Sequence, residues 1–220
     1  MHINKIITVS IALLLTLTFA GYSFAAEEYF SDLTGVPSKD KIIAMQEKGY
    51  IAGIGNHLFA PHEKVTAAQG VQFIVNCLEL NLDTVKFAKE PKATDYFVKA
   101  DNNSWYANAL IIAQVNGLEL PADLDPNKIW TREEFTYQLI LAAEKHANLP
   151  LIKLVPVKIA DQDQISIGYD GAIQRALTYG VICLDNQGKL NPKEEISREE
   201  AVEQIFNVLQ YIEKHPMPKD

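Results

Sequence analysis

Apolar and polar positions follow helical spacing along much of this chain, and one short pattern precedes such a stretch three times. The pattern is apolar-x-Pro-x-x-x-apolar-[Ser/Thr]-x-x-[Glu/Gln], and it occupies residues 59–69, 124–134 and 190–200 without gaps. Self-similarity at a nearly fixed period is the signature of a repeated structural unit. We therefore interpret the chain as three copies of one unit.

Each copy of the pattern predicts the start of a helix. A Ser or Thr followed three residues later by Glu or Gln forms a capping box, in which each side chain satisfies a free backbone amide. The proline five residues upstream stiffens the loop, because it cannot join a helix interior. Trp130 and Phe135, on either side of the cap, predict a hydrophobic staple. The predicted cap residues are Thr66, Thr131 and Ser197.

The helices that follow share one apolar face. Eight residues after the cap stand Ile74, Leu139 and Ile205, and apolar residues recur at offsets 9, 11 and 12. This spacing is typical of an amphipathic helix with one buried face.

An earlier helix in each unit ends at a glycine, which readily takes the left-handed conformation of a helix end. These helices are predicted over 39–48, 105–116 and 169–179, before Gly49, Gly117 and Gly180. No alternating pattern predicts a strand, so the fold class is all-α, with three helix-loop-helix units. We place the units at 29–83, 94–148 and 159–215, joined by linkers that contain proline. Since one helical hairpin cannot bury its apolar face alone, we expect one packed body.

The first 25 residues predict an export signal. Lys5 supplies a positive charge, residues 6–20 are mostly apolar, and Ser23-Phe24-Ala25 offers small residues for cleavage. The apolar run is shorter than the roughly 20 residues that a transmembrane helix needs, which makes an uncleaved membrane anchor the lesser alternative. We expect cleavage after Ala25 and an exported mature protein.

Charge and cysteine content narrow the possible partners. The chain has 28 acidic and 20 basic residues, a net charge of −8, and no basic stripe. Such a surface repels phosphate backbones, so we expect no nucleic-acid partner, and an anionic ligand would need a local pocket. Cys77 and Cys183 both lie in apolar patterns, so we expect buried hydrophobes and leave their pairing open.

These units resemble the S-layer homology family. The resemblance rests on Phe30-Ser31-Asp32, on Glu47-Lys48-Gly49, on the segment from Gly53-Ile54-Gly55 to Phe59-x-Pro61, and on Trp130-Thr131-Arg132-Glu133-Glu134. It covers about residues 29–215. It implies three repeats around a pseudo-threefold axis, with grooves between them that bind a pyruvylated secondary cell-wall polysaccharide, and hence a wall-associated or S-layer-associated protein.

The resemblance also implies which residues line the grooves. In the family these are an arginine at the second helix, an aromatic residue at the front of the first helix, and an early aspartate. Physically, a guanidinium makes a two-pronged contact with a carboxylate, free helix amides add donors, and an aromatic face stacks on sugar. The alternatives are surface ion pairs for the arginines and plain packing for the aromatic residues, and for Asp32 and Asp161 we favour capping of the first helix over contact with sugar hydroxyls. The candidate polysaccharide-binding residues are Arg132, Arg198, Trp105, Tyr106, Tyr169, Asp32, Asp101 and Asp161.

The three units depart from the family pattern in different ways. Unit 1 has Ala67 at the arginine position and Pro37 at the tryptophan position, and unit 3 has Gly168 beside Tyr169. In unit 2, Lys99 stands at the aspartate position and Asp101 is the nearest acid. Only unit 2 keeps both Trp105 and Arg132, so we expect these two residues to share the groove with the best carboxylate pocket. Arg132 should then matter most for binding and Arg198 second.

Other chemistries find little support in the sequence. Asp123-x-Asp125-x-Asn127, with Glu134 at the twelfth loop position, fits the count of a calcium loop, but Lys128 stands where that loop needs glycine. The histidines show no metal-ligand spacing, and no catalytic motif appears, so we expect no metal, no cofactor and no enzymatic activity. The competing hypothesis is a surface protein-interaction scaffold whose degenerate repeats no longer bind polysaccharide.

Overall fold

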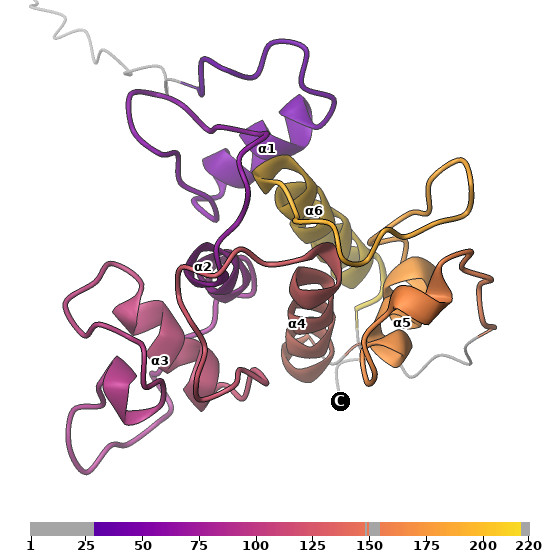
Figure 1. The fold of residues 1–220 in the computed structure, drawn as a ribbon. Coiled ribbons are helices and arrows are strands. Elements are labelled where there is room, and N and C mark those ends of the chain that lie inside the picture. The colour runs from indigo at the N-terminus through magenta and orange to yellow at the C-terminus, as the bar shows by residue number, and fades with distance from the viewer. Residues whose placement is uncertain (1–28, 148, 150–154, 217–220) are drawn as a thin grey trace, which may run out of the picture.

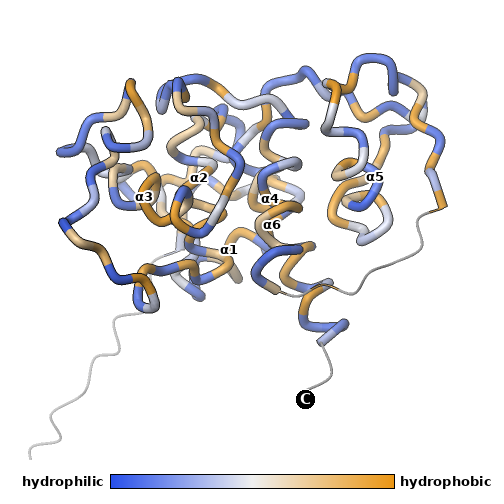
Figure 2. Tube along the Cα trace, turned by 90° about the horizontal axis from the view of Figure 1, so that it is seen from below, coloured by the Kyte–Doolittle hydropathy of each residue, from blue (hydrophilic) through white to orange (hydrophobic). Residues whose placement is uncertain are grey.

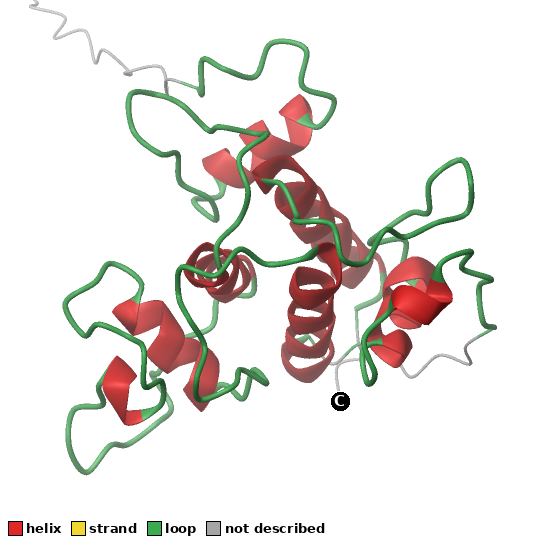
Figure 3. Cartoon of the chain, in the orientation of Figure 1, coloured by secondary structure: helices red, strands yellow, loops and turns green. Residues whose placement is uncertain are grey.

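The computed structural model describes residues 29–147, 149 and 155–216. Over these residues it contains six α-helices, two short 3-10 turns and no strands beyond isolated bridges (Figure 3). We call the helices that follow the capping boxes the inner helices: α2 (Ala67–Cys77), α4 (Arg132–His146) and α6 (Arg198–Lys214). The outer helices are α1 (Lys39–Glu47), α3 (Ala107–Val115) and α5 (Asp170–Thr178). The predicted all-α fold is confirmed.

All three predicted capping boxes form. In each, the Ser or Thr side chain accepts from the backbone amide three residues on, and the Glu or Gln side chain accepts from the amide of the cap residue. The inner helices therefore begin one residue after Thr66, Thr131 and Ser197. Trp130 is buried and its ring centroid lies 6.3 Å from that of Phe135, which confirms the predicted staple contact.

The segments before the inner helices meet around a pseudo-threefold axis. Three amides form a closed cycle of hydrogen bonds: Val65 N–H to Ile196 C=O at 3.1 Å, Ile196 to Trp130 at 3.1 Å, and Trp130 to Val65 at 2.9 Å. Because each unit donates to another in the same sense, the cycle closes only when all three units are present. The expected threefold arrangement is thus built into the backbone (Figure 1).

Each outer helix packs against the inner helix of a different unit. α3 packs on α2, α5 packs on α4, and α1 closes the ring on α6. Lys41 of α1 contacts Glu203 of α6 at 2.6 Å and Asn207 at 3.2 Å. Figure 2 shows hydrophobic stretches along the helices and hydrophilic ones in many of the loops. Buried apolar residues from all three units form one main core, as expected.

The ends of the outer helices confirm the glycine prediction. Gly49, Gly117 and Gly180 have φ values of 71°, 76° and 70°, in the left-handed region. The prediction for the cysteines is half right, because Cys77 is buried but Cys183 lies exposed in the loop after α5, and both are free. The predicted signal peptide lies outside the described residues. Within the described part of the chain, no helix has the length and apolarity needed to cross a membrane.

Candidate functional site

Three pockets lie at equivalent places around the axis, and each combines residues from different units. The Arg198 groove has a volume of about 410 Å³ and is lined by Ala52, Gly53, Ile54, Gln69, Gln72, Phe73, Asn76, Trp105 and Arg198. The Arg132 groove, of about 170 Å³, is lined by Arg132, Val181, Ile182, Cys183, Glu200, Glu203, Gln204 and Asn207. The Tyr169 groove, of about 240 Å³, includes Lys99, Glu119, Asp123, Lys128, Glu134, Gln138 and Tyr169.

Arg198 crosses from the start of α6 into unit 1, where its guanidinium lies between two aromatic rings. Its Cζ is 4.6 Å from the ring centroid of Phe59 and 5.3 Å from that of Phe73. Nε donates to the carbonyl of Phe59 at 2.7 Å, and Nη2 donates to the carbonyl of Ala52 at 2.8 Å. These contacts fix the plane of the guanidinium, and stacking on aromatic faces compensates part of its burial.

Arg198 is only 2% exposed, yet its side-chain hydrogen bonds in the described part of the chain go to carbonyls, and no carboxylate lies at ion-pair distance. Burial lowers the pKa of Arg198, while the more distant charges of Glu63 and Asp32 act in the opposite direction. An arginine remains protonated in proteins, so a positive charge persists at the wall of this groove.

Trp105 lies on the same groove as Arg198 and is 63% exposed. Its ring meets the edge of the Tyr106 ring at a centroid distance of 5.5 Å and an angle of 80°. Tyr106 is buried, and its hydroxyl accepts a 3.4 Å hydrogen bond from the amide of Asp101. Trp105 therefore presents its ring to the groove, whereas Tyr106 supports it from the core.

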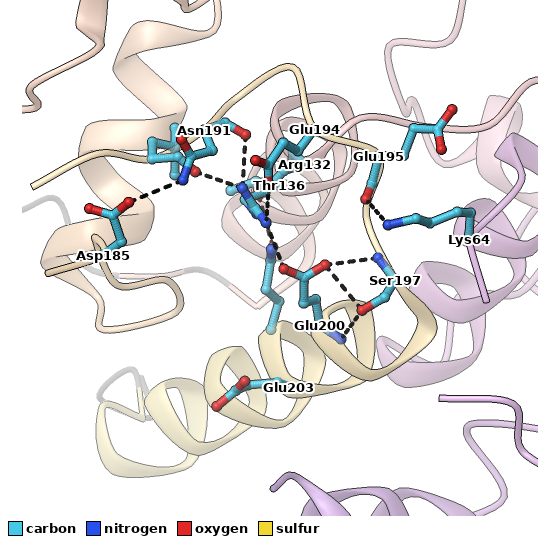
Figure 4. A network of polar contacts seen from close by, with 12 residues as sticks. Lys64, Arg132, Thr136, Asp185, Asn191, Glu194, Glu195, Ser197, Glu200 and Glu203 are labelled. Carbon is cyan, nitrogen blue, oxygen red and sulfur yellow. Dashed lines mark hydrogen bonds and ion pairs between the residues drawn. The ribbon is translucent and has the colours of Figure 1, made fainter. Parts of the chain in front are cut away.

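Arg132 occupies the equivalent place in the next groove, but its surroundings differ. Nη1 donates to the carbonyls of Leu190 and Asn191 at 2.9 and 2.8 Å. Nη2 contacts the carboxylates of Glu200 at 2.7 Å and Glu194 at 3.2 Å (Figure 4). Burial by itself would lower the pKa of Arg132, but these two carboxylates outweigh it and raise the pKa. The protein thus neutralises the charge of Arg132 internally.

The expectation that Trp105 and Arg132 share a groove is wrong, because the outer helices pack on other units. Trp105 instead lines the groove that Arg198 enters, so the aromatic ring and the guanidinium of this groove come from units 2 and 3. Residues that the sequence reasoning missed complete this groove: the loop at Ala52 and the amide side chains of Gln69, Gln72 and Asn76. Alignment of the three repeats could have pointed to these residues, since Gln69 stands at a capping-box position.

Asp32 and Asp161 do not cap the first helices, which is a second correction. The carboxylate of Asp32 accepts from the amides of Phe59 and Ala60 at 2.9 and 2.7 Å. Asp161, which is 3% exposed, accepts in the same way from the amides of Leu190 and Asn191, each at 2.8 Å. Both aspartates hold the loops whose carbonyls bind the arginines, so they position the grooves and do not line them.

The remaining candidates have local partners. Asp101 accepts from the amide of Asn103 and the hydroxyl of Ser104, in the turn before α3. Tyr169 stacks on Tyr137 with a centroid distance of 4.2 Å and lines the Tyr169 groove. Among the described residues no arginine lines that groove, because Ala67 stands at the corresponding position.

Helix amides do not add donors for an anion, contrary to the expectation. The amide of Arg132 donates to the carbonyl of Glu194 at 2.7 Å, and that of Arg198 donates to the carbonyl of Glu63 at 2.8 Å. The next amides, of Glu133 and Glu199, donate to the carbonyls of Pro192 and Pro61. The side chain of each arginine, and not the free amides of its helix, therefore lines the groove.

Fold and groove geometry together define a threefold repeat module with ligand-sized pockets between its units. Residues 29–69 and 158–202 match the S-layer homology domain. The chain is 25% identical over 204 residues to an amylopullulanase of Thermoanaerobacterium thermosulfurigenes, covering 89% of this chain and 10% of the relative. It is also 25% identical over 184 residues to the exoglucanase XynX of Acetivibrio thermocellus, covering 82% and 16%. Two segments of the chain, in the first and third units, are therefore S-layer homology repeats, and such repeats imply association with the cell wall at the cell surface.

Proposed function

We propose that this chain is a non-catalytic anchoring module that attaches to the cell wall by binding a pyruvylated secondary wall polysaccharide in the Arg198 groove. The observation that carries the proposal is the guanidinium of Arg198, which has no carboxylate partner in the described structure and lines the same pocket as the exposed Trp105. The match of the chain to only 10% and 16% of two large carbohydrate-acting relatives supports a modular role apart from catalysis.

The groove offers a complementary contact for each part of such a ligand. A guanidinium has five N–H donors, and two groups of Arg198 are engaged with carbonyls, which leaves donors for a carboxylate such as a pyruvate ketal. Trp105 supplies an apolar face on which a sugar ring can stack. Gln72 donates to Asn76 at 2.6 Å and Asn76 donates to the carbonyl of Tyr50 at 3.2 Å, so the carboxamide oxygen of Gln72 is the group that can accept from a sugar hydroxyl.

A protein-interaction scaffold is the competing function, and the burial of the Arg198 cation argues against it. Burying a cation without a carboxylate partner costs free energy, and a scaffold gains nothing from that cost. A protein that binds an anionic ligand does gain, because the ligand supplies the missing charge. Sedimentation of the mature protein with purified wall sacculi discriminates the two functions, since only the anchor should sediment with them.

The sharper test uses purified polymer and two variants of the Arg198 groove. Trp105→Ala removes an exposed ring, and Arg198→Lys keeps the charge but loses the planar fork. Each should weaken binding roughly tenfold to hundredfold, because a hydrogen-bonded charge or a stacked ring contributes about 1–3 kcal/mol. Binding isotherms measure the effect, and thermal unfolding checks that each variant is folded.

Arg132→Ala is the matched control, because Arg132 holds the same register position in another groove. Its effect on affinity should be smaller than that of Arg198→Lys, which reverses the order expected from the sequence. If folded Trp105→Ala and Arg198→Lys bind the polymer like wild type, the groove assignment is wrong and the scaffold becomes the better explanation.

A further inference from the structure

We infer that the charge of one capping-box residue decides which arginine can bind an anion: Gln69 leaves Arg198 available, whereas Glu200 occupies Arg132. This inference rests on the proposed function, because it explains how a single groove remains open to an anionic sugar. It arises from comparing two grooves that have the same backbone and differ at a few side chains.

Gln69 and Glu200 perform the same structural task. Each is the third residue of its inner helix, and each side-chain oxygen accepts from the amide of the cap residue, at 3.0 Å from Thr66 and 2.9 Å from Ser197. Capping therefore does not require the negative charge, since the neutral amide of Gln69 forms the same box. What differs is the charge presented to the arginine that enters from another unit.

In the Arg132 groove the capping residue acts as a built-in ligand. One oxygen of Glu200 caps Ser197, while the other accepts from Nη2 of Arg132 at 2.7 Å (Figure 4). Burial by itself would raise the pKa of Glu200, but its hydrogen bonds with Ser197 and Arg132 outweigh this and lower the pKa. The carboxylate of Glu200 therefore stays ionised. It occupies a guanidinium donor of Arg132 that an external carboxylate would otherwise bind.

The difference in charge extends along the helix. Glu203 of α6 lines the Arg132 groove, and Gln72 holds the same register position in the Arg198 groove. Glu203 is paired with Lys41 at 2.6 Å, and Glu194 adds another carboxylate to Arg132. The Arg198 groove has no acidic lining residue in the described structure. Glu63 is the counterpart of Glu194. Its charge acts to raise the pKa of Arg198, but only from beyond ion-pair distance.

The test exchanges the two capping residues, using substitutions that the chain already accepts at the equivalent sites. Q69E should retain the capping box but place a carboxylate beside Arg198, and affinity for pyruvylated polymer should fall about tenfold to hundredfold. Gln187→Glu, at an exposed turn, makes the same change in net charge and should leave affinity within about twofold of wild type.

The reverse exchange should open the second groove. E194Q/E200Q removes both carboxylates from Arg132, so binding of the polymer should increase in stoichiometry or apparent affinity. E195Q/E213Q is the control with equal charge, because both side chains are exposed and neither forms an ion pair among the described residues. Equal binding by these two double variants would overturn the part of the inference that concerns Arg132.

The outcomes separate this inference from the proposed function. If wild type does not bind the polymer, the proposed function fails. If wild type binds and folded Q69E binds equally well, the function stands and the role of Gln69 is wrong. A measurement without ligand adds a third criterion: in Q69E, carbon NMR should show that the new carboxylate titrates below the ordinary range, because it faces Arg198. A titration in the ordinary range would overturn the inference.

Discussion

At the scale of single residues, identical residue types serve different ends because their partners differ. Arg132 and Arg198 have the same place in their helices, yet one meets two carboxylates and the other meets two aromatic rings. The sequence alone could nominate both arginines and Trp105. It could not tell which of them meet, because that depends on which unit each outer helix packs against.

The aspartates that hold the loops make a prediction about pH. Burial alone would raise the pKa of Asp32, but the amides of Phe59 and Ala60, together with the charge of Arg198, lower it below the ordinary value of 3.8. The ionised carboxylate therefore stabilises the fold above that value, and this stabilisation is lost as the pH falls through the lower folded-state pKa.

Asp32→Asn should accordingly lower the melting temperature at neutral pH, with a cost of about 1 kcal/mol, since the site is partly exposed. The difference from wild type should shrink as the pH falls from about 4 towards 2, as the wild-type carboxyl also loses its charge. Thermal unfolding across pH measures this, with the exposed Asp163→Asn as control. A difference that stays constant with pH would contradict the role given to the charge of Asp32.

At the scale of elements, local signals predicted nearly all of the fold. Capping boxes located the inner helices to the residue, and glycines located the ends of the outer ones, because both depend on chemistry within a few residues. Cys183 was misjudged because its apolar neighbours belong to the loop after α5 and not to a helix. The close contact between α2 and the Trp130 ring, by contrast, joins segments far apart in the sequence, so no local pattern could indicate it.

Gly70 marks this contact and makes a prediction about stability. A methyl group at Gly70 would lie 2.4 Å from the ring of Trp130 and 3.4 Å from that of Phe135. Gly70→Ala gains up to about 1 kcal/mol in helix propensity, but overpacking typically costs about 1–3 kcal/mol, so we expect a net loss of stability.

Gly171 in α5 is the matched comparison, because the nearest atom to its added methyl is the flexible end of Arg175 at 3.2 Å. Gly171→Ala should stabilise the protein by up to about 1 kcal/mol. Denaturant unfolding of both variants provides the measurement. A stabilised Gly70→Ala would show that α2 and Trp130 are not in tight contact.

At the scale of the whole molecule, each outer helix packs on the inner helix of another unit and backbone hydrogen bonds join all three units, so the module is one packed body and not a string of three. The cycle of Val65, Trp130 and Ile196 needs a strand-like segment from each unit, and α1 completes the ring on α6. The Arg198 groove also depends on this packing, since residues from all three units line it.

This closure predicts a single unfolding transition, which the two tryptophans of the chain can report. Trp105 is exposed, so Trp105→Phe leaves the buried Trp130, beside the axis, as the sole tryptophan, whose fluorescence can be excited separately from that of the tyrosines. Its fluorescence and the helical circular dichroism should then give coincident unfolding curves, because loss of one unit breaks the backbone cycle for the other two. A fragment of residues 29–148 keeps Trp130 but lacks α5 and α6, so α4 loses its outer helix and α1 loses its support. That fragment should show no cooperative transition and a solvent-exposed Trp130. If it instead unfolds cooperatively with a buried indole, the first two units are stable alone, and the ring is an assembly of independent parts.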